Sequence, residues 1–103
     1  MSQSWKALNN LIEYPSGGII SRELIKTEKS DVTLFCLAAG TAISEHTATR
    51  EGFVYVVEGK GSFNLAGEEI VMLPNTIIPM AENAVHSLRA DENTSFILVL
   101  INN

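Results

Sequence analysis

From residue 15 to the end of the chain, short apolar runs alternate with polar or glycine-containing turns, one turn roughly every 8–12 residues. Some runs alternate apolar with polar positions, as residues 62–65 do. That period of two is typical of strands with one buried face. The pattern predicts an all-β barrel or sandwich with strands near residues 19–26, 32–38, 53–58, 62–65, 69–73, 77–78, 85–89 and 95–101.

The last of these runs, residues 95–101, is apolar almost throughout, so we expect both of its faces to be buried. One face would meet the barrel interior, and the other needs a cover. A second subunit is one candidate for that cover, and on this ground we expect a homodimer. The alternative is that residues 4–14 supply all of the cover.

Residues 4–14 are predicted to form a short amphipathic helix ahead of the barrel. Ser4 is suited to cap its first turn, and Pro15 ends it. Such a helix is too short to be stable alone, so we expect it to pack on the barrel or on a partner subunit. The apolar residues that would make this contact follow helical spacing: Trp5, Leu8, Leu11 and Ile12.

Composition and charge narrow the class of protein. The 103 residues suit one domain, residues 1–103, with the barrel over residues 17–101. Apolar residues make up 46% and charged residues 18%, as in globular proteins. The formal net charge of −5 argues against nucleic acid and anionic membranes as partners, because both bind basic surfaces.

The sequence also bears on where the protein resides. Its longest apolar run, residues 96–101, is far shorter than the ~20 residues that span a bilayer. The N-terminus lacks the basic and apolar regions of a signal peptide. A single cysteine, Cys36, cannot form an internal disulfide and is expected to be a buried, unreactive thiol. We therefore expect a cytoplasmic location.

The chain has two histidines, His46 and His86, and each lies between a turn and a strand. His46 follows Gly40 after an interval of five residues, and Gly59 ends the next predicted strand. His86 follows a proline and a turn. This arrangement resembles the two sequence motifs of the cupin family, in which such histidines usually hold a metal ion or a small molecule.

The chain is most similar to small single-domain, RmlC-like cupins that lack the second histidine and the glutamate of the first motif. Ala48 stands at the place of that histidine, and Gly52 at the place of that glutamate. The resemblance covers about residues 11–101, including stretches such as 44–48 and 80–90. It implies a jelly-roll barrel, or double-stranded β-helix, and brings little information about activity.

The two motifs predict a pocket inside the barrel. Counting back from Gly59 along a regular strand places positions 46, 48, 52, 54 and 56 on one face. His46 would then point inward, and His86 would face it from the opposite strand. The residues expected to line the pocket around the two histidines are Ala48, Gly52, Val54, Val56, Met80 and Leu88.

Two inward, neutral imidazoles can bind a divalent transition metal such as zinc, iron, manganese, nickel or copper. Two ligands are fewer than the three or four protein ligands of a stable centre. Glu51 is the candidate third ligand, although a regular strand points it to the opposite face from Gly52. A bulge over residues 49–52 would turn it inward and complete the two-histidine, one-carboxylate set of non-haem iron oxygenases.

Three functions are open at this point. The first is a binding module that holds a divalent metal or a small ligand through His46 and His86, with no catalytic residue assigned. The second is a metal-dependent oxygenase or isomerase in which Glu51 completes the metal shell. The third is a metal-free sensor or accessory domain that binds a small ligand. The simplest alternative is a pair of histidines hydrogen-bonded only to the backbone or water.

Overall fold

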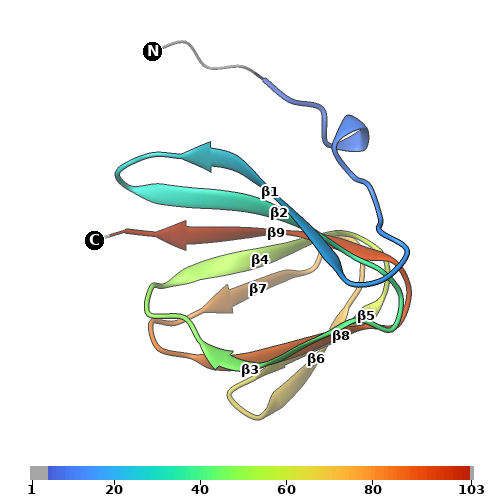
Figure 1. Ribbon diagram of the computed structural model, residues 1–103. Coiled ribbons are helices and arrows are strands. Elements are labelled where there is room, and N and C mark those ends of the chain that lie inside the picture. Colours follow the sequence, from blue (N-terminus) through green and yellow to red (C-terminus); the bar gives the residue numbers. More distant parts are fainter. Residues whose placement is uncertain (1–4, 103) are drawn as a thin grey trace.

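The computed structural model describes residues 5–102 as two antiparallel β-sheets that face each other (Figure 1). The larger sheet has the strand order β1-β2-β9-β4-β7, and the smaller sheet has the order β3-β8-β5-β6. The predicted all-β jelly-roll barrel is therefore confirmed. The strands are β1 (Ile19–Lys26), β2 (Ser30–Leu37), β3 (Ala42–Thr47), β4 (Gly52–Glu58), β5 (Gly61–Leu65), β6 (Glu68–Met72), β7 (Ile77–Met80), β8 (Val85–Ala90) and β9 (Thr94–Ile101).

Strand β9 is the central strand of the larger sheet and pairs with β2 and β4. Every residue from Thr94 to Leu100 is buried or half-buried, as its unbroken apolar sequence predicts. Strand β3, in contrast, is absent from the strands that the hydrophobic pattern predicts. It is an edge strand with mostly polar residues, so hydrophobic periodicity is a weak signal for it.

The predicted helix over residues 4–14 is wrong. Within residues 5–102 this segment contains only the 3-10 turn η1 (Leu8–Asn10), and Ser4 lies outside the described residues. Two consecutive asparagines interrupt the segment, and asparagine favours turns over helix interiors because its side chain competes for backbone hydrogen bonds. Trp5 is 89% exposed, so it is not part of the core of this chain.

No helix among the described residues is long and apolar enough to cross a membrane, and the cytoplasmic location stays a prediction.

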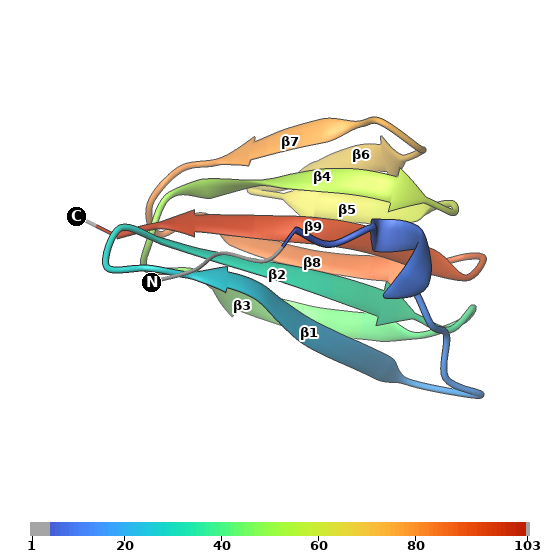
Figure 2. The ribbon, with the colours of Figure 1, turned by 90° about the horizontal axis from the view of Figure 1, so that it is seen from above.

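The N-terminal segment nevertheless covers part of the outer face of the larger sheet (Figure 2). Leu34 and Cys36 lie on that face, because they alternate with the core-facing residues of β2, yet both are buried. Tyr14 is anchored there: its hydroxyl donates a 2.7 Å hydrogen bond to Glu58, and burial raises its pKa. The segment therefore provides some of the cover that β9 needs. The homodimer stays a prediction.

The space between the two sheets holds one hydrophobic cluster with a cavity in it. Some members of the cluster pack without touching the cavity and fill the rest of the interior. The barrel thus has a solid part, which holds the sheets together, and a hollow part, which is available to a ligand. The solid part comprises Leu37, Val56, Met72, Ile78 and Ala90.

Candidate functional site

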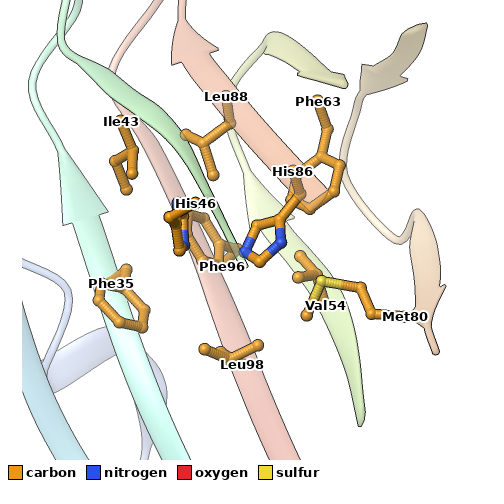
Figure 3. Close-up of a pocket in the computed structure, with 10 residues that line it drawn as sticks. All are labelled: Phe35, Ile43, His46, Val54, Phe63, Met80, His86, Leu88, Phe96 and Leu98. Atoms are coloured by element: carbon orange, nitrogen blue, oxygen red, sulfur yellow. The ribbon is translucent and has the colours of Figure 1, made fainter. Parts of the chain in front are cut away.

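Strands β3 and β8 bring the two histidines together. His46 and His86 are direct cross-strand partners in the smaller sheet, and their ring centroids are 4.0 Å apart with an angle of 61° between the planes (Figure 3). The sequence predicts that His86 faces His46 from an opposite strand, whereas the structure places the two side by side on neighbouring strands. The pair therefore acts as one polar patch on one wall of the cavity.

A bulge in β3 produces this pairing. Ile43 is paired with Leu88 and His46 with His86, so β3 advances three residues while β8 advances two. Ile43 and His46 both line the cavity, although a regular strand would put positions 43 and 46 on opposite faces. The extra residue lies between them and reverses the alternation. Without it, Glu45 rather than His46 would point inward.

Each imidazole is held by the backbone carbonyl two residues before it in the chain. Nδ1 of His46 lies 2.9 Å from the carbonyl oxygen of Ser44, and Nδ1 of His86 lies 3.2 Å from that of Ala84. A carbonyl oxygen can only accept a hydrogen bond, so Nδ1 carries the proton in both rings. When the rings are neutral, each Nε2 therefore keeps its lone pair. The same backbone contact on Nδ1 is what orients histidines that bind metals through Nε2.

The cavity beside the histidines has a volume of about 180 Å³ and is lined by both sheets (Figure 3). His86 is only 6% exposed and stacks on Phe63, with ring centroids 5.7 Å apart. His46 is exposed and also lines the cavity, so the cavity opens to solvent beside it. The remaining lining residues are all apolar: Phe35, Ile43, Val54, Met80, Leu88, Phe96 and Leu98.

The predicted pocket is therefore correct in part. Val54, Met80 and Leu88 line the cavity, whereas Val56 belongs to the solid part of the core. Ala48 and Gly52 do not line it, because they lie at the strand ends next to the loop that connects β3 to β4. The lining residues that the sequence reasoning missed are Phe35, Ile43, Phe63, Phe96 and Leu98. The alternation of residues 62–65 is a usable signal for Phe63, whereas the unbroken apolar runs around Phe35 and Phe96 do not reveal which residues face inward.

Comparison with known protein families shows to which family the chain belongs. The family model described as "Cupin domain" matches residues 33–102. The chain belongs to the cupin family. Its structure is similar to that of a cupin superfamily protein from Desulfitobacterium hafniense, over 100% of this chain and 94% of that one, with a TM-score of 0.87 and 16% identity.

Other relatives of this cupin differ in size. A variant of salicylate 1,2-dioxygenase from Pseudoaminobacter salicylatoxidans is similar over 84% of this chain and 28% of that one, with a TM-score of 0.74 and 15% identity. Likeness at this level of identity shows the fold alone. The catabolic ornithine carbamoyltransferase of Malacoplasma penetrans (strain HF-2) is 34% identical over 76 residues, which are 69% of this chain. The chain spans only 22% of the length of that relative.

Glu51 does not join the histidines as a third ligand. Among residues 5–102 there is no group of three histidine, cysteine, aspartate or glutamate side chains that could hold a metal ion. Glu51 is exposed just before β4, and its backbone carbonyl accepts a hydrogen bond from Ile101. The bulge that would turn it inward is absent from the pairing of β4 at Gly52, and the irregularities in this motif lie in β3 and near the end of β4, between Val56 and Glu58.

Gly52, which the resemblance to cupins places where the glutamate of the first motif is usual, has no room for a side chain in this structure. A Cβ atom at this position would lie 1.9 Å from the backbone oxygen of Val99 on β9. That separation is far inside van der Waals contact, so the backbones of β4 and β9 approach too closely for any side chain at this position. A glutamate at position 52 could therefore be accommodated only if β4 and β9 moved apart.

The surroundings of His86 oppose its charged form. Burial lowers the pKa of His86, and the neighbouring His46 lowers it further, although the hydrogen bond to Ala84 acts in the opposite direction. Arg50, in the loop between β3 and β4, could attract an anion to the cavity only if its side chain were free. It is instead bound to Asp31 at 2.6 Å and to Asn102, away from the lining.

We predict that stability depends on the protonation of His86. The pKa of His86 is lowered from 6.5, so between the two values the unfolded state binds more protons than the folded state. The free energy of unfolding should therefore be at its full value above about pH 6.5 and should fall as the pH drops through the folded pKa. Asp31 has a pKa lowered from 3.8, so its own contribution is lost only in more acidic solution.

An NMR titration of the His86 ring protons, together with thermal unfolding from about pH 7.5 to 5, checks this prediction. In the variant His86→Phe the decline in this range should be smaller than in the wild type. A measured pKa at or above 6.5, or the same decline in both proteins, would contradict it.

Proposed function

We propose that this cupin is a binding module that holds a small molecule in its barrel cavity, with His46 and His86 as the polar contacts. The observation that supports this proposal is the form of the histidine pair. Both rings are bonded through Nδ1 to backbone carbonyls, which leaves two Nε2 lone pairs beside an apolar cavity of about 180 Å³. Cavities with an apolar lining and a few placed polar groups are the usual form of small-molecule sites.

The lining residues argue for binding rather than for catalysis. Nucleophilic catalysis of the serine or cysteine type needs a hydroxyl or thiol beside the histidine base. The ten lining residues include no carboxylate, hydroxyl, thiol or amine. A sensor or accessory role remains within this proposal, because such a role requires only that ligand binding changes how the cupin associates with a partner.

Binding of a divalent transition metal is the second candidate, and the free Nε2 atoms favour it. His46 and His86 would hold the ion through these atoms, and a bound ion would supply Lewis acidity to a ligand in the cavity. The donor set fits only part of a metal centre, because Glu51 stays outside and Gly52 admits no side chain. The oxygenase or isomerase alternative, which needs Glu51 in the shell, is for this reason the weaker one.

The small-molecule function predicts saturable binding at the cavity. In amide NMR spectra of the chelator-treated protein, small ring-sized molecules should shift residues of β3, β8, β5 and β9 together. Among these molecules, those that carry a hydrogen-bond donor should bind roughly tenfold more weakly to the double variant His46→Ala, His86→Ala, since this variant loses both hydrogen-bond acceptors. Ser87→Ala is the matched control, because Ser87 lies next to His86 on β8 but outside the cavity lining. Shifts scattered over the surface, or no saturation, would overturn this function.

Metal binding, if it occurs, should depend on His46 and not on Glu51. Titration calorimetry with zinc should give binding that is lost in His46→Ala and unchanged in Glu51→Ala, since of these two residues only His46 presents a donor atom at the cavity. Equal affinity in the wild type and His46→Ala would place the ion elsewhere. An equal loss in both variants would show that Glu51 reaches the site.

A further inference from the structure

We propose that the cavity is built for a small, uncharged molecule with a single aromatic ring and one hydroxyl donor, a molecule of the phenol class. This inference rests on the proposed function and specifies its ligand. It follows from three properties of the same site: the size and shape of the cavity, the direction in which its polar wall can form hydrogen bonds, and the distribution of charge around it.

The size of the cavity suits one ring. Its volume is about 180 Å³, and an apolar protein cavity of about 150 Å³ is large enough to bind benzene. Aromatic side chains contribute much of the lining, and both Phe35–Phe96 and Phe63–His86 are stacked pairs. A flat ring can contact such a lining over a large area, and aromatic pairs are stabilised beyond what burial of their area alone provides.

The polar wall of the cavity can accept hydrogen bonds but not donate them. In both neutral imidazoles the Nδ1 proton is already given to a carbonyl oxygen, of Ser44 for His46 and of Ala84 for His86. The free Nε2 atoms have a lone pair and no proton. A ligand must therefore bring the donor, and a hydroxyl on the ring meets that requirement. A ligand without a donor would leave the acceptor of buried His86 unpaired, which is unfavourable.

The charges argue that the ligand is neutral. An anion buried in this cavity would need a cation nearby, because an unpaired buried charge is strongly unfavourable. The lining contains no lysine or arginine, and Arg50 is bound to Asp31 and Asn102. A cationic ligand is disfavoured as well, because no carboxylate lines the cavity.

Competitive binding of three matched probes tests this inference. Phenol carries the ring and the donor, toluene carries the ring alone, and benzoate carries the ring and a negative charge. Each is titrated into chelator-treated full-length protein at neutral pH, with cavity amide shifts as the readout. Transfer from water to a purely apolar cavity favours toluene over phenol, because the hydroxyl loses its hydrogen bonds to water. We expect the wild type to bind phenol at least as tightly as toluene and to bind benzoate least tightly.

A change at one histidine supplies the second readout. His86→Phe keeps a flat ring beside Phe63 and removes the acceptor, so the affinity ratio of phenol to toluene should fall roughly tenfold. The ratio should be unchanged in Ser87→Ala. The wild-type comparison holds independently of whether His86→Phe folds.

The other outcomes separate this inference from the proposed function. Toluene binding tenfold tighter than phenol in the wild type would overturn the inferred donor, and tightest binding of benzoate would overturn the inferred neutrality. Either result leaves a ligand-binding cavity in place. Saturable binding by none of the three probes would overturn both the inference and the proposed function.

Discussion

The register between β3 and β8 is the constraint on which the rest of this site depends. One extra residue in β3 places His46, instead of Glu45, opposite His86. Buried polar groups need hydrogen-bond partners, and in this barrel the carbonyl oxygens of Ser44 and Ala84 accept hydrogen bonds from the histidines two residues later in the chain. The same contacts determine which ring nitrogen is free. A local irregularity in one edge strand therefore controls the polarity of the whole cavity.

The larger sheet supplies the other half of the site. The close approach of β4 and β9 at Gly52 leaves no room for a side chain at this position. The residues of the larger sheet that line the cavity are all apolar: Phe35, Val54, Met80, Phe96 and Leu98. The chain thus has the cupin barrel, with two histidines at its cavity and, among residues 5–102, no group of three side chains that could hold a metal ion.

Much of this fold follows from patterns that a single sequence shows. The unbroken apolar run of β9 indicates a central strand, and regular alternation correctly places Val54 inside the barrel. The inward direction of His46 is also predicted, although by counting along a strand that is not regular. A bulge cannot be counted from sequence, because Ser44 and Glu45 resemble any other polar residues of an edge strand. The position of Phe35 and Phe96 in the cavity depends on which face of each apolar strand meets the other sheet, which is a tertiary property.

For the N-terminal segment, the sequence predicts a regular element that the structure does not contain. The spacing of Leu8, Leu11 and Ile12 is compatible with a helix, but these apolar side chains lie half-buried on a segment with only one 3-10 turn. Contact with a flat sheet face requires apolar residues without requiring a helix. Tyr14, which bonds to Glu58, anchors this segment through a contact between residues distant in sequence. Such anchors are visible only after the strands have been assembled.

The measurement to make first is the tautomeric state of His46 and His86, because the direction of hydrogen bonding in the cavity depends on it. Long-range proton–nitrogen NMR correlations of the chelator-treated protein, recorded above the pKa of both rings, distinguish a protonated Nδ1 from a protonated Nε2. The hydrogen bonds to Ser44 and Ala84 predict that both rings carry the proton on Nδ1 and leave Nε2 free. A dominant Nε2 proton on either ring would mean that the cavity wall donates a hydrogen bond, and the inference of a hydroxyl-donating ligand would be wrong.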